Sequence, residues 1–306
     1  MRSSVLLSIF AAAGYASAIG QLGMSLGVKR NSDGECKTSD DYNTDFDTIA
    51  SYTDTVRVYA ASDCNTLENI IPALKEKNFK LVLGVWPTDD THFSEEKTAL
   101  STYLPTIDAS YIPTILVGSE ALYRGDLTAD ELASDINAVR DLVHAIDGYD
   151  SVPIGTVDSW NVLVDGANVD AITASDVVYA NAFSYWQGQT MANSSYSFFD
   201  DIMQALQSIQ TAKGATDITF WVGETGWPTD GGSYESSTPS VSNAATYWQE
   251  SVCAMRAWGV NTFVFEAFDE SWKPATSGVE GVETHWGVFT DDSDSSPKYS
   301  LSCTYD

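Results

Sequence analysis

Eight short apolar runs recur along the chain, and longer stretches that mix apolar and polar residues separate them. Each run has five or six residues, many of them β-branched, with little alternation between apolar and polar positions. Such near-continuous hydrophobicity is typical of strands that are covered on both faces of a sheet. The predicted strands are residues 24–28, 56–60, 81–86, 114–118, 153–157, 177–182, 219–223 and 262–266.

The segments between these strands carry apolar residues at a spacing of three or four, which predicts helices with one face toward a core. The pattern is clearest in residues 67–74, 132–143 and 199–209. Eight strands that alternate with helices over about 250 residues predict an α/β fold, the (β/α)8 TIM barrel, as a single domain. An open doubly wound sheet is the alternative, although no GxGxxG motif follows the first predicted strand.

Two of the helices carry signals for their ends. Asp200 and Asp201 suit a helix start, because acidic side chains stabilise the N-terminal turn. A later helix should begin with Ser242 or Asn243 as its N-cap. It should run to residue 258, because Gly259 is a favourable residue just past a helix end.

The first 18 residues are expected to be a secretory signal peptide. Arg2 supplies a positive charge, residues 5–13 are apolar but too few to span a bilayer, and residues 16–18 (ASA) form a small-residue cleavage site. The alternative is an N-terminal anchor or a buried first helix. We therefore assign residues 19–306 to the folded domain. The final SLSCTYD lacks the hydrophobic tail of a lipid-anchor signal.

The chain has 15 basic and 43 acidic residues, for a formal net charge of -28. This charge disfavours nucleic acid and anionic membranes as partners, because both would be repelled, whereas a neutral polymer would not. Acidity that keeps a secreted protein soluble explains the charge equally well. The charge therefore excludes partners without selecting one. Beyond residue 18 the sequence has no apolar stretch long enough to span a membrane, and we expect a monomer.

The four cysteines, Cys36, Cys64, Cys253 and Cys303, predict two disulfides formed in an oxidising compartment. Three pairings are open at this stage. No CxxC motif is present, and the three histidines are isolated in the sequence, so we expect neither a metal site nor a cofactor. Asn193 heads the one N-glycosylation sequon and is a candidate acceptor of a glycan.

Polar and aromatic residues gather where the predicted strands end. In a (β/α)8 barrel the carboxyl ends of all strands meet at one rim, and active sites lie there. Aromatic faces stack on sugar rings, whereas carboxylates and amides bind sugar hydroxyls, so this composition predicts a sugar-binding cleft. The residues at the strand ends are Tyr59, 86–87, Glu120, 158–160, 181–186, 224–227 and 266–272.

Glu120 and Glu224 are the strongest catalytic candidates at this rim. Glu120 ends the segment ILVGSE and Glu224 lies in FWVGETGWP, and each is a lone carboxylate after a buried strand and a glycine. Cleavage of a glycosidic bond needs one carboxylic acid to protonate the leaving oxygen and one carboxylate to attack or to activate water. A retaining mechanism needs the two groups about 5–5.5 Å apart, and inversion about 6.5–9.5 Å. For either residue alone, the alternative is an ion pair with a nearby Arg or Lys.

Five segments resemble glycoside hydrolase family 17, and they are most similar to its fungal cell-wall glucanosyltransferase branch. The segments are VGSEALYRGDLTADEL, TVDSWNVLV, NAFSYWQGQT, FWVGETGWPTDGG and FVFEAFDESWKP. The combination of GETGWPT and FEAFDESWK is specific, and the similarity extends from Gly20 to Cys303. The resemblance implies a (β/α)8 barrel and a retaining enzyme that acts on β-1,3-glucan in the cell wall.

The resemblance also implies roles for individual residues. Glu120 would be the acid/base and Glu224 the nucleophile. Ser119 occupies a position where much of the family has an Asn that can bind the sugar 2-hydroxyl, although the fungal branch commonly has Ser. The substrate contacts implied are Tyr59, Ser119, Asn181, Tyr185, Glu266, Glu270 and Lys273.

The four rim tryptophans are either stacking platforms for sugars or parts of the core, and sequence alone leaves this open. They are Trp160, Trp186, Trp227 and Trp272. Of these, we treat Trp186 and Trp272 as candidate substrate contacts.

Two sets of charged residues have alternative interpretations. A buried Arg57 near Glu120 or Glu224 would lower the pKa of that carboxyl group, and the alternative is a salt bridge inside the barrel. The pair Asp269-Glu270 either supports Glu224 through a charge network or forms a structural ion pair with Lys273, and we favour the support.

The expected chemistry leaves two reactions open. Glu224 attacks the anomeric carbon while Glu120 protonates the leaving oxygen, and Glu120 then acts as base for the acceptor. If the acceptor is water, the enzyme is a β-1,3-glucanase or glucosidase. If it is a sugar hydroxyl, the enzyme is a glucanosyltransferase, which we favour from the resemblance to the fungal branch. A non-catalytic wall protein is a remote alternative, and the intact pair of glutamates argues against it.

Overall fold

The computed structural model describes residues 19–294 and 296–304, and the predicted signal peptide lies outside them. Eight parallel strands form a closed barrel in which β1 pairs with both β2 and β8. This closure confirms the (β/α)8 barrel and excludes the open doubly wound sheet. The strands are β1 (Leu22–Ser25), β2 (Thr55–Val58), β3 (Lys80–Val85), β4 (Thr114–Ser119), β5 (Ile154–Ser159), β6 (Val178–Asn181), β7 (Phe220–Thr225) and β8 (Asn261–Val264).

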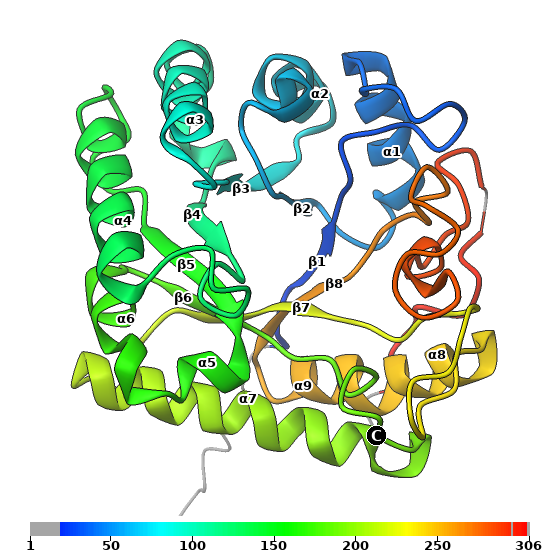
Figure 1. The fold of residues 1–306 in the computed structure, drawn as a ribbon. Helices are drawn as coiled ribbons and strands as arrows, with labels where there is room; N and C mark the ends of the chain where they lie inside the picture. The colour runs from blue at the N-terminus through cyan, green and yellow to red at the C-terminus, as the bar shows by residue number, and fades with distance from the viewer. Residues whose placement is uncertain (1–18, 295, 305–306) are drawn as a thin grey trace, which may run out of the picture.

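Helices surround the barrel, as Figure 1 shows in a view into its centre. They are α1 (Ser39–Ile49), α2 (Thr66–Lys77), α3 (Asp90–Tyr103), α4 (Ala129–His144), α5 (Trp160–Leu163), α6 (Val169–Ala174), α7 (Met191–Lys213), α8 (Val241–Tyr247), a π-helical segment (Trp248–Cys253) and α9 (Ala254–Ala257). Short 3₁₀ turns lie at Asp63–Asn65, Leu104–Thr106, Ala109–Tyr111, Gly166–Asn168 and Val282–Thr284.

Each predicted apolar run overlaps one observed strand, and the largest offset occurs at β1. Strand β8 ends at Val264, two residues before the predicted end. The amide of Phe265 still donates to the Thr225 carbonyl at 2.8 Å, but the amide of Glu266 donates to the Trp286 carbonyl at 3.2 Å. The chain therefore leaves the barrel here to pair with the C-terminal segment, although the sequence stays apolar.

The predicted start of the helix over residues 199–209 was wrong. Helix α7 begins at Met191, so Asp200 and Asp201 lie in its middle. Asp201 is buried, and its carboxylate accepts a hydrogen bond from the Gln187 side chain. An acidic pair was misread as a helix start because one of its members faces inward to hold a loop.

The predicted N-cap of the later helix was also wrong, whereas its end was correct. Ser240 caps α8: its backbone is extended, and its hydroxyl accepts from the Asn243 amide at 3.0 Å. The Asn243 side chain instead donates to the Thr238 carbonyl at 2.7 Å. The helical segment ends at Ala257, and Gly259 follows with a φ of 85°, a left-handed conformation that glycine adopts without strain.

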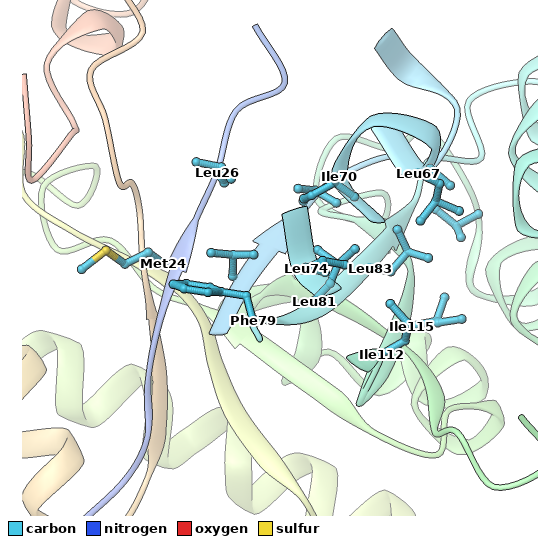
Figure 2. Close-up of a cluster of buried hydrophobic side chains, with 14 of the residues drawn as sticks. Met24, Leu26, Leu67, Ile70, Leu74, Phe79, Leu81, Leu83, Ile112 and Ile115 are labelled. Atoms are coloured by element: carbon cyan, nitrogen blue, oxygen red, sulfur yellow. The ribbon is translucent and has the colours of Figure 1, made fainter. Parts of the chain in front are cut away.

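The space between the helices and the outer barrel wall holds the larger part of the apolar core. Figure 2 shows Ile70 and Leu74 of α2 facing Leu81 and Leu83 of β3. Full burial of each such side chain contributes roughly 1.5–3 kcal/mol relative to exposure. The predicted 67–74 pattern is therefore confirmed as the inward face of a helix.

Inside the barrel, large side chains fill the end opposite the rim. The rings of Tyr179, Trp221 and Phe263 contact one another, with centroids 5.0–6.4 Å apart. Gly23 on β1 makes room for this packing, because a Cβ there would lie 2.3 Å from the Phe263 ring. The floor is thus packed, and ligands can approach only from the rim.

Two disulfides join distant segments: Cys36 pairs with Cys64, and Cys253 pairs with Cys303. The first connects the loops that follow β1 and β2. The second attaches the C-terminal segment to the π-helical segment. In the part of the chain that the structure describes, no helix is long and apolar enough to cross a membrane.

Candidate active site

A cavity of about 510 Å³ opens at the carboxyl ends of the strands, within the size range of small-molecule sites. Carboxylates, aromatic rings and amides line it together. The lining residues are Glu120, Tyr123, Ser159, Trp160, Asn161, Phe183, Trp186, Gln187, Glu224, Phe265, Glu283 and Trp286. The structure therefore brings the two predicted catalytic glutamates into one cavity at the predicted rim.

Glu224 lies within β7 and is buried, with 7% of its surface exposed. Gly223 leaves room for side chains from β5 and β6, because a Cβ there would lie 2.5 Å from the Val157 side chain and 2.6 Å from Asn181 Oδ1. The Glu224 carboxylate accepts from Arg57 Nη1 at 2.8 Å. Burial raises the pKa of Glu224 to about 7, and the Glu120 charge adds to this rise whereas Arg57 opposes it. The predicted lowering by Arg57 is present but smaller than the effect of burial.

Glu120 lies one residue beyond β4, where the ladder with β5 shifts register. It has a φ of 56°, in the left-handed region that side chains other than glycine seldom adopt. Gly118, with a φ of 75°, begins this change of direction. The side chain is partly exposed, and its Oε1 accepts from Asn181 Nδ2 at 3.1 Å. A register shift of this kind re-aims a side chain at the end of a strand.

Arg57 connects the surroundings of the two glutamates. This fully buried side chain donates from Nη1 to Glu224 and from Nη2 to Ser119 Oγ at 2.9 Å. Its guanidinium lies 4.7 Å from the centre of the Tyr59 ring. Burial raises the pKa of Tyr59 well above its ordinary value, and the Glu224 charge adds to this rise. Ser119 and Tyr59 therefore lie behind the catalytic pair, outside the cavity lining.

The segment after β8 holds three carboxylates around one lysine. Lys273 Nζ lies 2.6 Å from Glu270, 3.8 Å from Glu266 and 4.0 Å from Glu283. Burial raises the pKa of Glu266 well above its ordinary value, the Glu270 charge adds to the rise, and Lys273 opposes it. This environment favours the neutral acid form of Glu266. Of the four side chains, only Glu283 lines the cavity.

The pair Asp269-Glu270 does not act as the predicted support of Glu224. Asp269 turns the other way and pairs with Lys298 Nζ at 2.6 Å, whereas Glu270 forms the ion pair with Lys273. Glu224 is paired with Arg57 instead. The structural ion pair, the less favoured alternative, is the arrangement found, because the chain turns between the two acidic residues.

The rim tryptophans divide between the cavity and other surroundings. Trp160 and Trp186 line the cavity. Trp227 is buried in the core, with its indole nitrogen donating to the Thr238 carbonyl at 3.0 Å. Trp272 lies outside the cavity, where Lys29 Nζ sits 5.0 Å from its ring centre.

Tyr185 is fully buried behind Trp186, and its hydroxyl donates to the Gly232 carbonyl. The two rings meet nearly edge to face, with centroids 4.9 Å apart. As substrate contacts, Tyr185 and Trp272 stay predictions without a place in the cavity lining.

Several lining residues were missed at the sequence level. Glu283 and Trp286 belong to a segment after β8 that has little regular structure, so no strand end marked them. Phe265 was assigned to strand interior, and Tyr123 is 55% exposed in the turn after Glu120. The motif GVETHWGVF, with an acid and a tryptophan after a glycine-rich stretch, was the available signal.

Asp63, His92 and Glu96 form a group whose ligand atoms lie within 4.8 Å of one another. Their hydrogen bonds explain this grouping. His92 Nδ1 contacts the Trp86 carbonyl at 2.7 Å and its Nε2 contacts Asp63 at 2.9 Å. The Glu96 oxygens accept from the amides of Ala61 and Ser62, each at 2.8 Å. The hydrogen bonds of this group therefore connect the loop after β2 to α3.

A barrel whose rim cavity places a pair of glutamates at strand ends among aromatic rings is typical of glycoside hydrolases, because cleavage requires a proton donor and an attacking carboxylate. Residues 22–303 match the model of Glycosyl hydrolases family 17. The chain belongs to this family, which confirms the resemblance seen in the five segments. It is therefore a glycoside hydrolase or transglycosylase.

Curated relatives cover nearly the whole chain. The chain is 62% identical over 303 residues to a Glucan 1,3-beta-glucosidase from Saccharomyces cerevisiae, covering 97% of this chain and 96% of that protein. It is 49% identical over 291 residues to a Glucan 1,3-beta-glucosidase from Schizosaccharomyces pombe, covering 94% and 88%.

A solved structure extends the similarity to the fold. The glycoside hydrolase family 17 beta-1,3-glucanosyltransferase from Rhizomucor miehei is 30% identical, with a TM-score of 0.78, covering 92% of this chain and 97% of that chain. An active-site mutant of the same enzyme in complex with laminaritriose has a TM-score of 0.79 at 29% identity.

Proposed function

We propose that this protein is a retaining β-1,3-glucanosyltransferase that remodels β-1,3-glucan of the fungal cell wall. It cleaves one glucan chain through a glycosyl-enzyme and passes the glycosyl unit to another chain. The names of the relatives support β-1,3-glucan as the substrate, because the curated proteins and the Rhizomucor miehei enzyme share this linkage. The net charge of -28 is compatible with a neutral polysaccharide.

In the first step, the Glu224 carboxylate attacks the anomeric carbon while the bond to the leaving oxygen breaks. Glu120 gives its proton to that oxygen, and the product is a glycosyl ester on Glu224. Arg57 at 2.8 Å favours the ionised form of Glu224 that the attack requires. The packed floor of the barrel leaves the rim as the route for the sugar chain.

In the second step, Glu120 removes a proton from the acceptor hydroxyl, the acceptor oxygen attacks the anomeric carbon, and the bond from this carbon to Glu224 breaks to release the carboxylate. The observation that carries transfer is the cavity wall beside Glu120. Tyr123 lies in the turn after Glu120, Trp160 and Asn161 directly follow the neighbouring strand β5, and these lining residues offer two rings and an amide to an incoming sugar. Because the acid/base stands next to the leaving oxygen, this wall is suited to the departing and the accepting sugar.

Hydrolysis is the second candidate, favoured by the names of the relatives that are 49–62% identical. Both reactions share the glycosyl-enzyme, and they differ only in the molecule that resolves it. The balance therefore depends on how well the wall beside Glu120 holds a sugar against water.

The implied substrate contacts fall into two groups within this proposal. We propose that Trp186 stacks directly on a sugar ring. Tyr59, Ser119 and Asn181 would act by holding Arg57 and the two glutamates, because they lie outside the cavity lining. The charge cluster of Glu266, Glu270 and Lys273 would act on the sugar through Glu283 and Phe265, which face the cavity.

Secretion to the cell wall is part of the proposal. Both disulfides suit an oxidising compartment, and the first 18 residues have the composition of a signal peptide. Asn193, the proposed glycosylation site, is exposed in the first turn of α7.

The test is chromatography of products from laminaripentaose labelled at its reducing end. Labelled products longer than the donor, with a share that grows as donor concentration rises, are expected from transfer. Shorter products alone at every donor concentration would refute transfer and leave the glucosidase. Trp160→Ala should lower the ratio of transfer to hydrolysis, and Trp258→Ala, an exposed tryptophan outside the cavity lining, is the matched control.

A further inference from the structure

Asp158 is a buried carboxylate near Glu120 that the mechanism has not used. It lies in β5, its exposed fraction is 0%, and it does not line the cavity. Its two oxygens accept three backbone hydrogen bonds. The amide of Leu122 donates to Oδ2 at 2.9 Å, and the amides of Tyr123 and Ser159 donate to Oδ1 at 3.2 and 2.8 Å.

Two of these donors belong to the turn that directly follows Glu120. This turn is closed by the Arg124 amide, which donates to the Glu120 carbonyl at 3.0 Å. The third donor, Ser159, lines the cavity on the neighbouring strand. Asp158 therefore ties the turn after β4 to the end of β5.

The backbone conformation at Glu120 needs hydrogen bonds of this kind to hold it. Its left-handed φ of 56° is disfavoured for a glutamate, and such a conformation persists only where its surroundings hold it. The Glu120 amide donates to the Val157 carbonyl at 3.0 Å, just before Asp158. The Val157 carbonyl and the Asp158 carboxylate thus hold the backbone at Glu120 and just after it.

The hydrogen-bond partners of the buried Asp158 carboxyl group are backbone amides rather than a cation. Among the described residues no Lys, Arg or His forms a salt bridge with it, so backbone amides are its partners. Burial raises the pKa of Asp158 to about 7, and the Glu120 charge adds to this rise, whereas the three backbone hydrogen bonds oppose it. An apolar residue would be easier to bury, but it would leave three amides without an acceptor.

We infer that Asp158 is a positioning residue for proton transfer: its carboxylate holds the turn after β4 so that Glu120 points at the glycosidic oxygen. This inference rests on the proposed role of Glu120 as acid/base. Asp158 exchanges no proton with the substrate. A misplacement of a catalytic group by about 1 Å can cost about 10²-fold in rate, so a residue of this kind affects proton transfer before it affects binding.

The test compares two glycosides of laminaribiose in the Asp158→Asn variant. In laminaritriose, the leaving group is a sugar hydroxyl that must receive the Glu120 proton. In the 2,4-dinitrophenyl glycoside, the C–O bond breaks with release of a stable phenolate, which needs no proton. Added azide then attacks the glycosyl-enzyme as an anion, so the second step needs no base either.

We expect kcat/KM on laminaritriose to fall roughly 10- to 100-fold, because general acid catalysis contributes about 10²–10⁴-fold. With the dinitrophenyl glycoside and azide, the expected change is less than about threefold. An equal loss on both substrates would overturn the inference, because it would show a general structural defect. The ratio of the two activities does not depend on the folded fraction of the preparation.

Two further variants keep the outcomes distinct. Glu120→Gln should show the same selectivity more strongly. If it does not, the proposed role of Glu120 fails and the inference about Asp158 fails with it, whereas selectivity in Glu120→Gln without selectivity in Asp158→Asn overturns the inference alone. In the double variant, Asp158→Asn should add little to the loss from Glu120→Gln, because both act through one group. If Asp158→Asn does not fold, Asp158→Glu should show the selectivity in milder form, and loss of equal size on both substrates would again be decisive against the inference.

Discussion

The two proposed catalytic glutamates share one cavity but are held in different ways. Glu224 lies inside a strand, is buried, and is paired with the Arg57 guanidinium. Glu120 lies just beyond a strand, is partly exposed, and depends on backbone hydrogen bonds around a left-handed residue. Strand β7 and Arg57 hold the Glu224 carboxylate in place, whereas the turn after β4 directs the Glu120 side chain.

This difference suits the two proposed roles. A nucleophile must attack from one position in its ionised form, and a strand with an adjacent cation provides both. An acid/base must release and recover a proton at an oxygen that changes between steps, so it needs access to the open side of the cavity. Arg57 links the surroundings of the two glutamates through hydrogen bonds, because it donates to Glu224 and to Ser119, the residue before Glu120.

The largest effect is expected from Glu224→Gln. Loss of the attacking carboxylate removes the covalent route, so kcat on laminaripentaose should fall by about 10⁴-fold or more. The measurement is single-turnover and steady-state product formation. Glu95→Gln, an exposed substitution on α3, is the control and should stay near the parent rate. Activity within tenfold of the parent would contradict Glu224 as nucleophile.

Arg57→Met should have the second largest effect, because it leaves a buried carboxylate without its cation. We expect a loss in kcat/KM of roughly 10²-fold at acidic pH, because a buried carboxyl group without its cation is protonated in a larger fraction of molecules and cannot attack. Arg57 lowers the pKa of Glu224, so its removal raises that pKa further, and the acid limb of kcat/KM should move to higher pH. Lys77→Met, which breaks a solvent-exposed ion pair with Asp47, should leave the limb in place. An unmoved limb in Arg57→Met would disconnect the guanidinium from the nucleophile.

Ser119→Ala tests the Arg57 link from the Glu120 side. The substitution removes the acceptor of one Arg57 hydrogen bond, 2.9 Å long, and leaves a buried N–H without a partner. We expect a loss in kcat/KM of about three- to tenfold, smaller than that of Arg57→Met. Ser110→Ala, in the loop before β4, is the control. A loss as large as that of Arg57→Met would mean that Ser119 contacts the sugar itself.

Glu266→Gln should give the smallest effect on catalysis and a measurable one on stability. Burial raises the pKa of Glu266 in the folded state, so the group contributes stability below its ordinary pKa of 4.5 and this contribution is lost as pH rises. Glutamine does not titrate. The unfolding free energy of the variant, relative to the parent, should therefore rise between pH 4 and pH 8 in urea titrations monitored by tryptophan fluorescence. A difference that is constant with pH would contradict a raised pKa.

The sequence predicted the features that depend on position along a strand. The barrel, the rim and the joint location of Glu120 and Glu224 follow from strand ends, because parallel strands bring their carboxyl ends together. Local geometry also explains the glycine before each glutamate. Gly118 adopts a left-handed φ, and Gly223 is in close contact with the Val157 and Asn181 side chains.

The features that depend on side-chain direction could not be predicted. Tyr185 and Trp186 are neighbours in sequence, yet one is buried and the other lines the cavity. Asp269 and Glu270 are adjacent, yet they pair with different lysines. The role of Asp158 was hidden for another reason, since its partners are backbone amides that leave no mark in the residue types.

The closure of the barrel by β1 and β8 places a constraint on how the chain is made. Strand β1 cannot pair with β8 until residues 261–264 have been synthesised. The Gln21 amide likewise donates, at 2.7 Å, to the side chain of Asn261, which lies 240 residues later in the chain. Cys36 and Cys64 can join early, whereas Cys253 must wait for Cys303 near the end of the chain. The barrel therefore cannot close before β8 has been made, although Arg57 and Asn181, the hydrogen-bond partners of the two glutamates, precede β8 in the chain.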